Sequence, residues 1–516
     1  MNIDKRNIKI AIPEDVKFVL NRLRENNGTA FAVGGCIRDS LMGKEPNDWD
    51  ITTNLIPQKV VTLFPEYSIV EKGIEYGTIS VFINDCEYEI TTFRKDAGSK
   101  DCRHPEEVSF SNSIEEDLER RDFTVNAMAY NLENGLVDPF NGYEDLNQKL
   151  LKAVGNPNER FKEDALRMMR AIRLSAQHGF TIEDKTYKAI IENNALIENI
   201  SQERFNKELS KTLLSNNPEY VEEFYKTGLA TFIFPELVDI FECVQDNPNH
   251  WRGKRATTVG EHTMDVLKNA VIYGVNDSVY NELDVRLALL THDFGKPATK
   301  STRIRNGFGE VDSFFGHPEK SVEIAEECLK RLKYPKSVIS KVSKLVKYHD
   351  IEFAKIKNGE IKPNGSALRK AYAEFGAVKK NSIDEANELL EKLFAVRICD
   401  ASGQNPEAVD GFSMSSFEKV DEVKSVIKIL KDNPSILNVF MPISGEDVRI
   451  ALNLTGKGMK VHGKFIGDVL KKLQEKVIKD NDFLIKLEPE KSYETILSYA
   501  QSMGMKNIVG EEFFEK

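Results

Sequence analysis

The sequence lacks a long apolar run, an excess of positive charge and any closely spaced pair of cysteines. No stretch of its 516 residues approaches the roughly 18 to 20 consecutive apolar residues that span a bilayer, so we expect no membrane segment. Acidic side chains outnumber basic ones by 82 to 71, which gives a net charge of −11. Bulk charge therefore does not hold this chain on nucleic acid, and a polyanionic partner must bind a local basic patch.

The cysteines and the N-terminal residues exclude two further classes. The six cysteines, none in a CxxC pair, are Cys36, Cys86, Cys102, Cys243, Cys328 and Cys399. Their wide spacing argues against a disulfide framework and against a thiolate zinc site. Residues 1–15 are charged and lack the apolar stretch of a secretory signal, so we expect a cytoplasmic protein.

The pattern of apolar residues changes after about residue 160 of the chain. Before that point strand-like and helix-like segments mix, whereas afterwards nearly everything predicts helices joined by short polar turns. The predicted strands are 29–33, 78–83 and 87–93, and residues 13–25 predict a helix. Residues 158–178 carry apolar side chains every three to four positions and are followed by Gly179, which predicts one continuous helix.

Asp48 and Asp50 form a DxD pair in an extended context. On a strand, alternation would point both carboxylates to one face, roughly 6 to 7 Å apart along the backbone. Carboxylates of this kind hold Mg²⁺ together with substrate phosphates. Taken alone, a DxD pair is more often a solvated turn.

Gly34 and Gly35 follow the predicted strand 29–33 and precede a predicted helix that carries Arg38. Paired glycines let the backbone approach a triphosphate closely, and the first N–H groups of a helix bind phosphate. A tight strand-to-helix turn explains the same residues. Glu89, on the predicted strand 87–93, is our candidate for a third catalytic carboxylate, with a surface strand charge as the alternative.

Five ordered motifs resemble the class II tRNA nucleotidyltransferases, the family of the CCA-adding enzymes and the bacterial poly(A) polymerases. The motifs are FAVGGCIRD at 31–39, DWD at 48–50, YEITTFR at 88–94, RRDFTVNA at 120–127 and EDALR at 163–167. The resemblance implies that Asp48 and Asp50 bind Mg²⁺ and are catalytic, with Glu89 beside them. The nucleotide-binding residues that it implies are Gly34, Gly35, Arg38, Arg121, Asp122, Asn126, Asp164, Arg167 and Arg170. Two metal ions would activate the RNA 3′-hydroxyl and stabilise the leaving pyrophosphate.

Asp164 and Arg167 lie three residues apart in the predicted helix 158–178, so we expect their side chains to be neighbours on one face. A carboxylate that accepts from an exocyclic amino group, beside a guanidinium that donates to a ring nitrogen, fits cytosine and adenine and rejects uracil and guanine. A surface ion pair explains the same spacing. We expect Arg160 to support this pocket and Arg173, on the opposite face, to be structural.

One loop departs from the family pattern. Family members often carry Asp-Gly-Arg-Arg-Pro after the TFR motif, and this chain has Asp101-Cys-Arg-His-Pro105 in its place. The family associates this loop with the switch from C to A addition, so the lost glycine keeps partial addition open as an alternative.

A second set of residues combines histidines with aspartates on predicted helices. A single histidine on an apolar helix is usually a core residue, but imidazoles beside a carboxylate are typical ligands of first-row metals. The order H, HD, H, H, D, with HDFGKP at 292–297, resembles the HD phosphohydrolase superfamily over residues 257–405. The metal ligands that this resemblance implies are His262, His292, Asp293, His317, His349 and Asp400. It also implies hydrolysis of a phosphoester with a divalent transition metal or Mg²⁺. Lys296 and Lys300 are either phosphate contacts or solvated lysines.

Lysines gather near the end of the chain and could meet an RNA backbone. They are Lys457, Lys460, Lys464, Lys471, Lys472, Lys476 and Lys479, against Asp468 and Glu475 in the same stretch. Phosphate contacts dominate RNA affinity, so this local excess of charge is a candidate binding patch for tRNA. An ordinary solvated helix face is the equal alternative.

We therefore expect an α+β, mostly helical, multidomain fold with a polymerase-beta-like head built on a small mixed sheet. The expected domains are a nucleotidyltransferase head at 1–152, a helical neck for RNA binding and nucleotide selection at 153–240, an all-α HD domain at 241–405 and a helical body and tail at 406–516.

The predicted function is addition of C and A nucleotides to tRNA 3′ ends from CTP and ATP, without a nucleic-acid template. A phosphohydrolase activity in the HD domain is predicted beside it. Within the same class, a poly(A) polymerase or a partial CC-adding or A-adding enzyme is the alternative. From another class, the alternative is an HD phosphohydrolase whose head senses nucleotide.

Overall fold

The computed structural model describes two compact units of the chain. The described residues are 5, 8–97, 107–357, 360–378, 382–409, 412–452, 459–488 and 492–503. The first unit comprises Met1–Val238 with Arg331–Lys333, and the second comprises Asp239–Lys330 with Tyr334–Lys516. Within the described residues, no helix is both long and apolar enough to cross a membrane.

A seven-stranded mixed sheet organises the start of the first unit, with the strand order β3-β4-β5-β2-β1-β8-β9. Its strands are β1 (Ala30–Val33), β2 (Ile51–Thr53), β3 (Ser68–Gly73), β4 (Thr78–Ile83), β5 (Cys86–Thr92), β8 (Ala129–Asn131) and β9 (Gly135–Val137). Strands β2 and β5 pair in parallel, and the other neighbours are antiparallel. The strands predicted at 29–33, 78–83 and 87–93 are confirmed.

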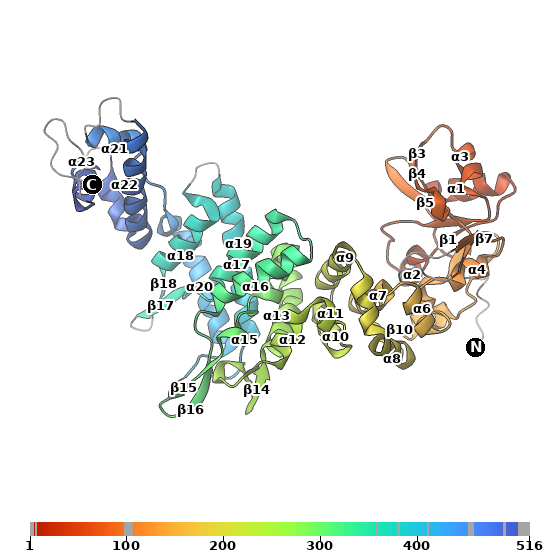
Figure 1. Ribbon diagram of the computed structural model, residues 1–516, viewed down its shortest axis with the longest axis horizontal. Helices are drawn as coiled ribbons and strands as arrows, with labels where there is room; N and C mark the ends of the chain where they lie inside the picture. Colours follow the sequence, from red (N-terminus) through yellow and green to blue (C-terminus); the bar gives the residue numbers. More distant parts are fainter. Residues whose placement is uncertain are drawn as a thin grey trace. The chain divides into compact units, whose positions relative to one another are not determined.

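The helices of this head pack on the sheet through apolar stripes. Helix α1 (Glu14–Glu25) buries Val16, Val19, Leu20 and Leu23, which share one helical face. Figure 1 shows α1 and α3 (Pro57–Leu63) beside β4 and β5. The other elements of this region are α2 (Gly35–Leu41), β6 (Arg94–Ala97), β7 (Glu107–Phe110), α4 (Ile114–Glu119), α5 (Gly142–Asn147) and β10 (Leu150–Leu151).

The helix predicted over 158–178 is broken, so that prediction is wrong in one respect. The chain forms α6 (Pro157–Glu163) and α7 (Leu166–His178), and Asp164 between them has extended backbone angles of φ −145° and ψ 105°. The Asp164 carboxylate accepts a hydrogen bond from Leu166 N at 3.1 Å. Such local bonding of an aspartate to the backbone competes with the helix, so Asp164 begins a new helix instead of continuing the old one.

Five further helices follow in the first unit, and the last of them, α12, extends beyond Val238 into the second unit. They are α8 (Asp184–Asn193), α9 (Gln202–Leu213), α10 (Glu222–Lys226), α11 (Ala230–Ile233) and α12 (Pro235–Glu242), with the short strand β11 (Thr181–Ile182). Phe205 of α9 is buried against Phe224 and Phe234, with ring centroids 6.2 and 6.3 Å away. Helix α9 also packs against α7.

The second unit is helical, as predicted for the later part of the chain. Its longer helices are α13 (Val259–Gly274), α14 (Leu283–Thr291), α16 (His317–Arg331), α17 (Lys336–Tyr348), α18 (Gly365–Tyr372), α19 (Ile383–Ser402), α20 (Ser416–Asp432), α21 (Gly445–Ala451), α22 (Met459–Lys479) and α23 (Ser492–Ser502). Its short elements are β12 (Val244–Gln245), β13 (Trp251–Arg252), β14 (Arg255–Thr258), α15 (Lys296–Thr299), β15 (Ser301–Arg305), β16 (Gly309–Ser313), β17 (Ala354–Lys357) and β18 (Glu360–Pro363). The predicted α+β, mostly helical fold is confirmed.

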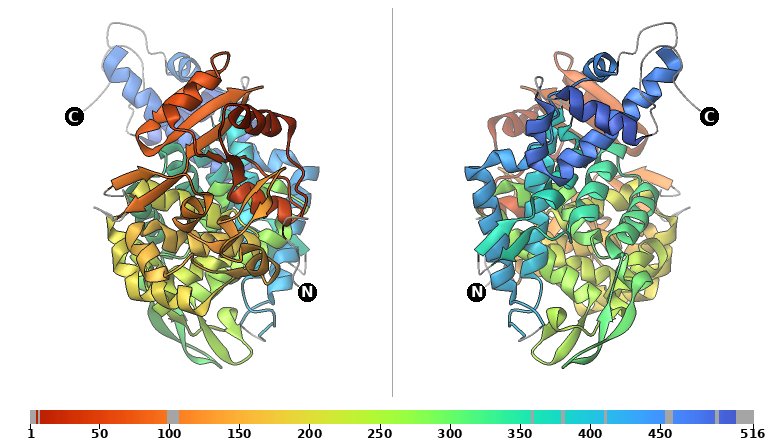
Figure 2. Two further views of the ribbon diagram at one scale, coloured as in Figure 1. Left: turned by 90° about the vertical axis from the view of Figure 1, so that its right-hand side faces the viewer. Right: turned by 90° about the vertical axis from the view of Figure 1, so that its left-hand side faces the viewer.

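Helix α14 is the central element of this unit, because every residue from Asp284 to Thr291 is buried. It contacts α13, α17 and α19. The hairpin of β15 and β16 extends away from these helices in Figures 1 and 2. Helices α21 to α23 form a smaller core of their own around Val448, Val469 and Leu473.

A buried lysine joins α14 to α19. The Lys392 side chain is 1% exposed, and its ammonium lies 2.7 Å from Asp284, 2.7 Å from Glu282 and 2.5 Å from Glu388. The three carboxylates are close enough together to hold a metal ion. Lys392 pairs with all three, so this cluster is an ion-pair network around one buried ammonium.

Replacing this lysine is expected to destabilise the second unit. Lys392→Met leaves Asp284 buried without its cation, which should lower the free energy of unfolding by about 3 kcal/mol. Denaturant unfolding followed by circular dichroism would measure the change. Lys341→Met is the matched control, because Lys341 also pairs with Glu388 but is 30% exposed. Equal stability of the two variants would contradict the role given to Lys392.

Candidate functional site

The turn between β1 and α2 brings a glycine against two charged side chains. Gly34 has φ 86° and ψ −130°, a conformation that residues with a side chain rarely adopt. A Cβ atom at Gly34 would lie 2.9 Å from Arg121 Nη1 and 3.9 Å from Asp50 Oδ2. Gly34 is therefore required for its backbone angles and for space, and it lies next to Asp50 and Arg121.

The DxD pair precedes β2 instead of lying within it, since β2 begins at Ile51. Asp50 O still accepts from Val33 N at 3.0 Å, which continues the pairing with β1. The parallel register pairs Ile51 with Ile90, so Asp50, the residue before β2, lies level with Glu89 of β5. Sequence separation alone could not show that Glu89 faces the pair.

The three head carboxylates repel one another. Burial raises the pKa of Asp50, and the charge of Asp48 raises it further against the opposing charge of Arg121. Burial and the charge of Asp50 likewise raise the pKa of Glu89. Among the described residues, no group of three metal-type ligands within 4.8 Å includes these side chains. The spacing suits cations that keep substrate or water oxygens as further ligands, as Mg²⁺ does.

A buried chain of hydrogen bonds links the glycine turn to the neck. Arg38 Nη1 donates to Asn126 Oδ1 at 2.5 Å, and Asn126 Nδ2 donates to Asp122 Oδ1 at 3.3 Å. Arg170 Nε donates to Asp122 Oδ2 at 2.7 Å. Burial opposes ionisation of Asp122, but the charges of Arg170 and Arg167 lower its pKa to about 2. The structure therefore brings Arg38, Asn126, Asp122 and Arg170 into one network.

Arg121 is held more loosely than these residues. Its Nη2 lies 3.4 Å from Asp117 Oδ2, and within the described part of the chain its buried Nε has no hydrogen-bond partner. Arg120, the next residue back, binds the same aspartate at 2.7 Å. Arg121 thus offers donors beside Gly34 and Asp50, where an anion would find them.

Asp164 and Arg167 are not neighbours on one helix face, which corrects the geometry predicted from their spacing. Asp164 is bound by Arg204 of α9 at 2.8 and 3.2 Å. Arg167 binds Glu163 at 2.6 Å and donates to Arg120 O at 2.7 Å. Asp164 lies in the break between α6 and α7, whereas Arg167 belongs to α7, so the two residues do not share one helix.

Three arginines around this region have definite partners. Arg204 escaped the sequence analysis because it lies 40 residues from Asp164 on another helix. Arg160 donates to Glu119 O at 2.9 Å, and its own carbonyl oxygen accepts a hydrogen bond from Arg167 Nη1 at 3.2 Å, which agrees with the supporting role expected for it. Arg173 forms a buried pair with Glu208 at 2.5 Å, which agrees with the structural role expected for it.

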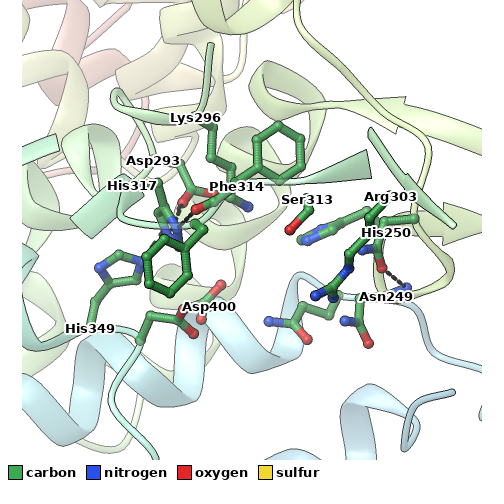
Figure 3. A pocket seen from close by; sticks show the side chains of 14 residues that line it. Asn249, His250, Asp293, Lys296, Arg303, Ser313, Phe314, His317, His349 and Asp400 are labelled. Carbon is green, nitrogen blue, oxygen red and sulfur yellow. Dashed lines mark hydrogen bonds and ion pairs between the residues drawn. The ribbon is translucent and has the colours of Figure 1, made fainter. Parts of the chain in front are cut away.

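The histidines and aspartates of the predicted HD site form a compact buried centre. Its residues come from α13, the ends of α14 and α17, the start of α16 and the last turn of α19: His262, His292, Asp293, His317, His349 and Asp400. Two groups have all their ligand atoms within 4.8 Å, and they share Asp293: His262 with His292, and His317 with His349. Asp400 Oδ1 lies 3.1 Å from His262 Nε2. Figure 3 shows Asp293 and Asp400 near His317 and His349.

Backbone carbonyls orient all four imidazoles. The Nδ1 atoms of His262, His292, His317 and His349 lie 3.0, 2.8, 2.9 and 2.7 Å from the carbonyl oxygens of Gly403, Leu289, Phe314 and Val346. A carbonyl only accepts, so each Nδ1 carries a proton, and in the neutral ring each Nε2 presents its lone pair to the centre. The Nε2 atoms are 3.4 Å apart in one pair and 3.2 Å in the other.

This donor set fits divalent metal ions. Lone pairs that face each other at such distances repel unless a cation lies among them. Both carboxylate oxygens of Asp293 are buried, and Oδ2 lies 2.7 Å from the Lys296 ammonium. Burial opposes ionisation of Asp293, but His292 and Lys296 hold its pKa well below the usual range. Asp293 is thus an ionised ligand placed between the two histidine pairs.

The pocket over this centre has a volume of about 300 Å³. Lys296 lines it and lies 2.7 Å from Asp293 Oδ2. Lys300 is bound to Asp312 at 2.9 Å and does not line the pocket. His250 was missed, because residues 245–253 predicted only a polar loop; its buried ring lies 4.9 Å from that of His262.

The predicted lysine patch is only partly covered by the described residues, and the predicted loop 101–105 is not covered. Of the lysine patch, Lys464, Lys471, Lys472, Lys476 and Lys479 are exposed on α22. Lys457 lies outside the described residues, as does the side chain of Lys460. The loop Asp101–Pro105 also lies outside them.

Three families match separate parts of the chain. Residues 30–152 match the Poly A polymerase head domain, and residues 179–241 match the family described as the probable RNA and SrmB-binding site of polymerase A. Residues 259–386 match the HD domain. These matches confirm the resemblance of the head to nucleotidyltransferases and of the second unit to HD proteins.

Curated relatives match the first part of the chain. The CCA-adding enzyme of Limosilactobacillus reuteri (strain DSM 20016) is 46% identical over 223 residues, which are 43% of this chain and 55% of the relative. The CCA-adding enzyme of Enterococcus faecalis is 44% identical over 228 residues, 44% of this chain and 54% of the relative. The chain therefore spans about half the length of the curated relatives that it matches.

Solved structures share the fold over most of the chain. The crystal structure of the Bacillus stearothermophilus CCA-adding enzyme in complex with CTP has a TM-score of 0.61 at 22% identity, and the match covers 95% of this chain and 98% of that one. A CCA-adding enzyme in complex with ATP has a TM-score of 0.56 at 18% identity, with 99% of each chain covered.

Gly295 provides a test of how the metal centre is assembled. A Cβ atom there would lie 2.5 Å from His317 O and 2.5 Å from Ser321 N, both in the backbone of α16. Gly295→Ala should therefore displace His317 and lower the free energy of unfolding by about 2 kcal/mol. Chemical unfolding and calorimetric titration with Mn²⁺ would measure both effects.

The matched control is Gly467→Ala, where a Cβ atom meets nothing within 4 Å. It should leave Mn²⁺ binding unchanged. Wild-type Mn²⁺ affinity in Gly295→Ala would contradict the proposed assembly.

Proposed function

We propose that the head and neck add C and A nucleotides to tRNA 3′ ends from CTP and ATP, without a nucleic-acid template, with Mg²⁺ at Asp48 and Asp50. The observation that carries the proposal is the contact of the Gly34 turn with Asp50 and Arg121, joined by buried hydrogen bonds to Asp122 and the neck. The relatives that match this part of the chain are named CCA-adding enzymes.

The side chains of the head have separable roles in this reaction. Gly34 and Gly35 admit the triphosphate close to the backbone, and Arg38 and Arg121 bind its charge. Asn126 holds Arg38, so the guanidinium is oriented before the nucleotide arrives. When bound, two Mg²⁺ ions would activate the RNA 3′-hydroxyl and stabilise the leaving pyrophosphate.

Base selection falls to Asp164, Arg167 and Arg170 on the neck. Asp164 would accept from the exocyclic amino group of cytosine or adenine, and Arg167 would donate to the ring nitrogen. In the structure, Asp164 pairs with Arg204, and Arg167 pairs with Glu163. A nucleotide therefore has to compete with these ion pairs, and the base that satisfies both groups does so best.

We propose a second activity for the HD centre, hydrolysis of a phosphoester. His262, His292, Asp293, His317, His349 and Asp400 would hold one or two divalent metals, which supply an activated water. The carbonyl contacts of the four histidines fix the ligand atoms in advance. Lys296 binds Asp293 and lines the pocket, where it can also meet a phosphate oxygen.

The proposal assigns residues 1–152 to the nucleotidyltransferase head, 153–240 to the neck, 241–405 to the HD domain and 406–516 to the body and tail. The exposed lysines of α22 are assigned to the tRNA backbone. A poly(A) polymerase or a partial CC-adding or A-adding enzyme uses the same head chemistry and is the second candidate.

An extension assay with tRNA that lacks its 3′ end tests the first activity. The wild-type protein should add C from CTP and then A from ATP, and stop after three nucleotides. Asp48→Ala with Asp50→Ala should lower the rate by about a thousandfold, because removing the metal ligands removes several kcal/mol of transition-state stabilisation. Glu45→Ala, an exposed carboxylate nearby in the sequence, is the control and should add normally.

Other patterns of addition identify the alternatives. Long A tails would show a poly(A) polymerase, and a product that ends after CC or takes only A would show a partial enzyme. No addition by the wild type, with hydrolysis intact, would favour an HD phosphohydrolase with a nucleotide-sensing head.

Asp293→Asn tests the second activity without touching the first. The variant replaces the ligand shared by both histidine pairs, so hydrolysis of bis(p-nitrophenyl) phosphate with Mn²⁺ should fall by about a hundredfold or more. Addition of C to tRNA should be unchanged. Wild-type hydrolysis by Asp293→Asn would refute the role of the HD centre.

A further inference from the structure

The pocket over the HD centre has two unlike sides. One side carries the metal-type ligands Asp293, His317, His349 and Asp400. Figure 3 shows Arg303, His250 and Asn249 together on the other side. Gln404 also lines the pocket. We call Asn249, His250, Arg303 and Gln404 the donor wall.

We propose that the donor wall is the subsite that binds the non-bridging phosphate oxygens of the substrate, and that Lys419 is the positioning residue that turns its two amides toward them. The proposal rests on the proposed phosphoester hydrolysis, and it names residues that neither the HD motif nor the sequence spacing indicates.

Lys419 of α20 bonds to both amide side chains of the wall. Its ammonium donates to Asn249 Oδ1 at 3.0 Å and to Gln404 Oε1 at 2.6 Å. An ammonium has donors and no acceptor, so only the oxygen of each amide can face it. The NH₂ groups of Asn249 and Gln404 are therefore turned away from Lys419, on side chains that line the pocket.

The amides are supported by the backbone on both sides. Asn405 N donates to Asn249 O at 2.7 Å, and Asn405 Nδ2 donates to Pro248 O at 2.8 Å. These bonds tie the loop that carries Asn249 to the chain that follows Gln404. The two NH₂ groups are thus held on connected backbone segments, as a preorganised pair of donors requires.

The surroundings of Lys419 disfavour its charged form. Burial and the nearby charge of Arg397 lower its pKa to about 8. A lysine in such surroundings needs partners, and the pocket amides supply two of them.

The rest of the wall also favours an anion. Arg303 of β15 supplies a guanidinium, which has donors only. His250 is 8% exposed, and within the described residues its Nδ1 has no hydrogen-bond partner. The acidic residues that line the pocket, Asp293, Asp350 and Asp400, are ligands of the metal centre or adjacent to one. The wall itself contains no carboxylate.

This arrangement selects the chemical class of the ligand. A tetrahedral phosphoester offers oxygens to metal ions on one side and to N–H donors on the other. Since the wall offers neutral amides, an imidazole and one guanidinium, it binds a phosphate of low charge, such as a phosphodiester, without needing a cluster of lysines.

Isosteric variants test the wall in the full-length, Mn²⁺-loaded protein. Asn249→Asp and Gln404→Glu keep the oxygen that faces Lys419 but replace each NH₂ by a second oxygen. Each should weaken inorganic phosphate binding about tenfold and raise KM for bis(p-nitrophenyl) phosphate similarly, since a lost hydrogen bond to a charged group is worth about 1.5 kcal/mol or more. Their kcat should stay within about twofold of wild type, because the metal ligands are untouched.

Asn269→Asp is the control for added charge, because Asn269 lies on α13 and does not line this pocket. It should leave phosphate affinity and KM unchanged.

Lys419→Met tests the positioning role. Without the ammonium, the amides of Asn249 and Gln404 can turn over and present oxygen to the pocket. KM and the dissociation constant of phosphate should both rise about tenfold, while kcat and the unfolding midpoint change little. Lys428→Met is the control, because Lys428 is exposed on the same helix.

The outcomes separate this proposal from the proposed hydrolysis. Wild-type hydrolysis with unchanged KM and phosphate affinity in Asn249→Asp, Gln404→Glu and Lys419→Met would overturn the donor wall alone. Calorimetric phosphate binding that depends on these residues, without hydrolysis of any phosphoester, would support the wall and overturn the hydrolase. Absence of phosphate binding to the Mn²⁺-loaded wild type would overturn the wall.

Discussion

The HD centre depends on hydrogen bonds that lie outside it. Each of its four imidazoles donates a hydrogen bond from Nδ1 to a backbone carbonyl. In the neutral rings, four Nε2 lone pairs and the Asp293 carboxylate then face one another in a buried space. Such a set is stable when cations lie within it. The backbone segments that supply the carbonyls therefore place the Nδ1 proton of each histidine and leave a set of ligand atoms that a metal ion would stabilise.

The head also gathers negatively charged side chains, but it arranges them differently from the HD centre. Burial and the charge of Asp48 raise the pKa of Asp50, and burial and the charge of Asp50 raise the pKa of Glu89, but these carboxylates are spaced more widely than the HD ligands. A cation there keeps room for substrate oxygens, which suits a reaction on a nucleoside triphosphate. The HD centre instead offers nearly all its ligands from protein. One chain thus carries an open and a preorganised metal-type site.

Orientation by a polar or charged partner on another element recurs in both units. In the head, Asn126 holds Arg38, and Asp122 holds Arg170. In the neck, Arg204 holds Asp164. In the HD pocket, Lys419 holds Asn249 and Gln404. In each case the partner reduces the orientations available to the side chain that it holds.

The sequence by itself determined the mixed head, the helical remainder and the residue types of both sites, because hydrophobic periodicity and short motifs are local properties. It also indicated Asp48, Asp50 and the six HD ligands by their order along the chain. Only the tertiary structure decided that Glu89 lies level with Asp50, that Asp164 breaks its helix and binds Arg204, and that Lys419 orients the pocket amides. These contacts join residues that are separated in the chain. Strand register and helix packing set the distances between such residues, and the spacing of residues in the sequence does not indicate these distances.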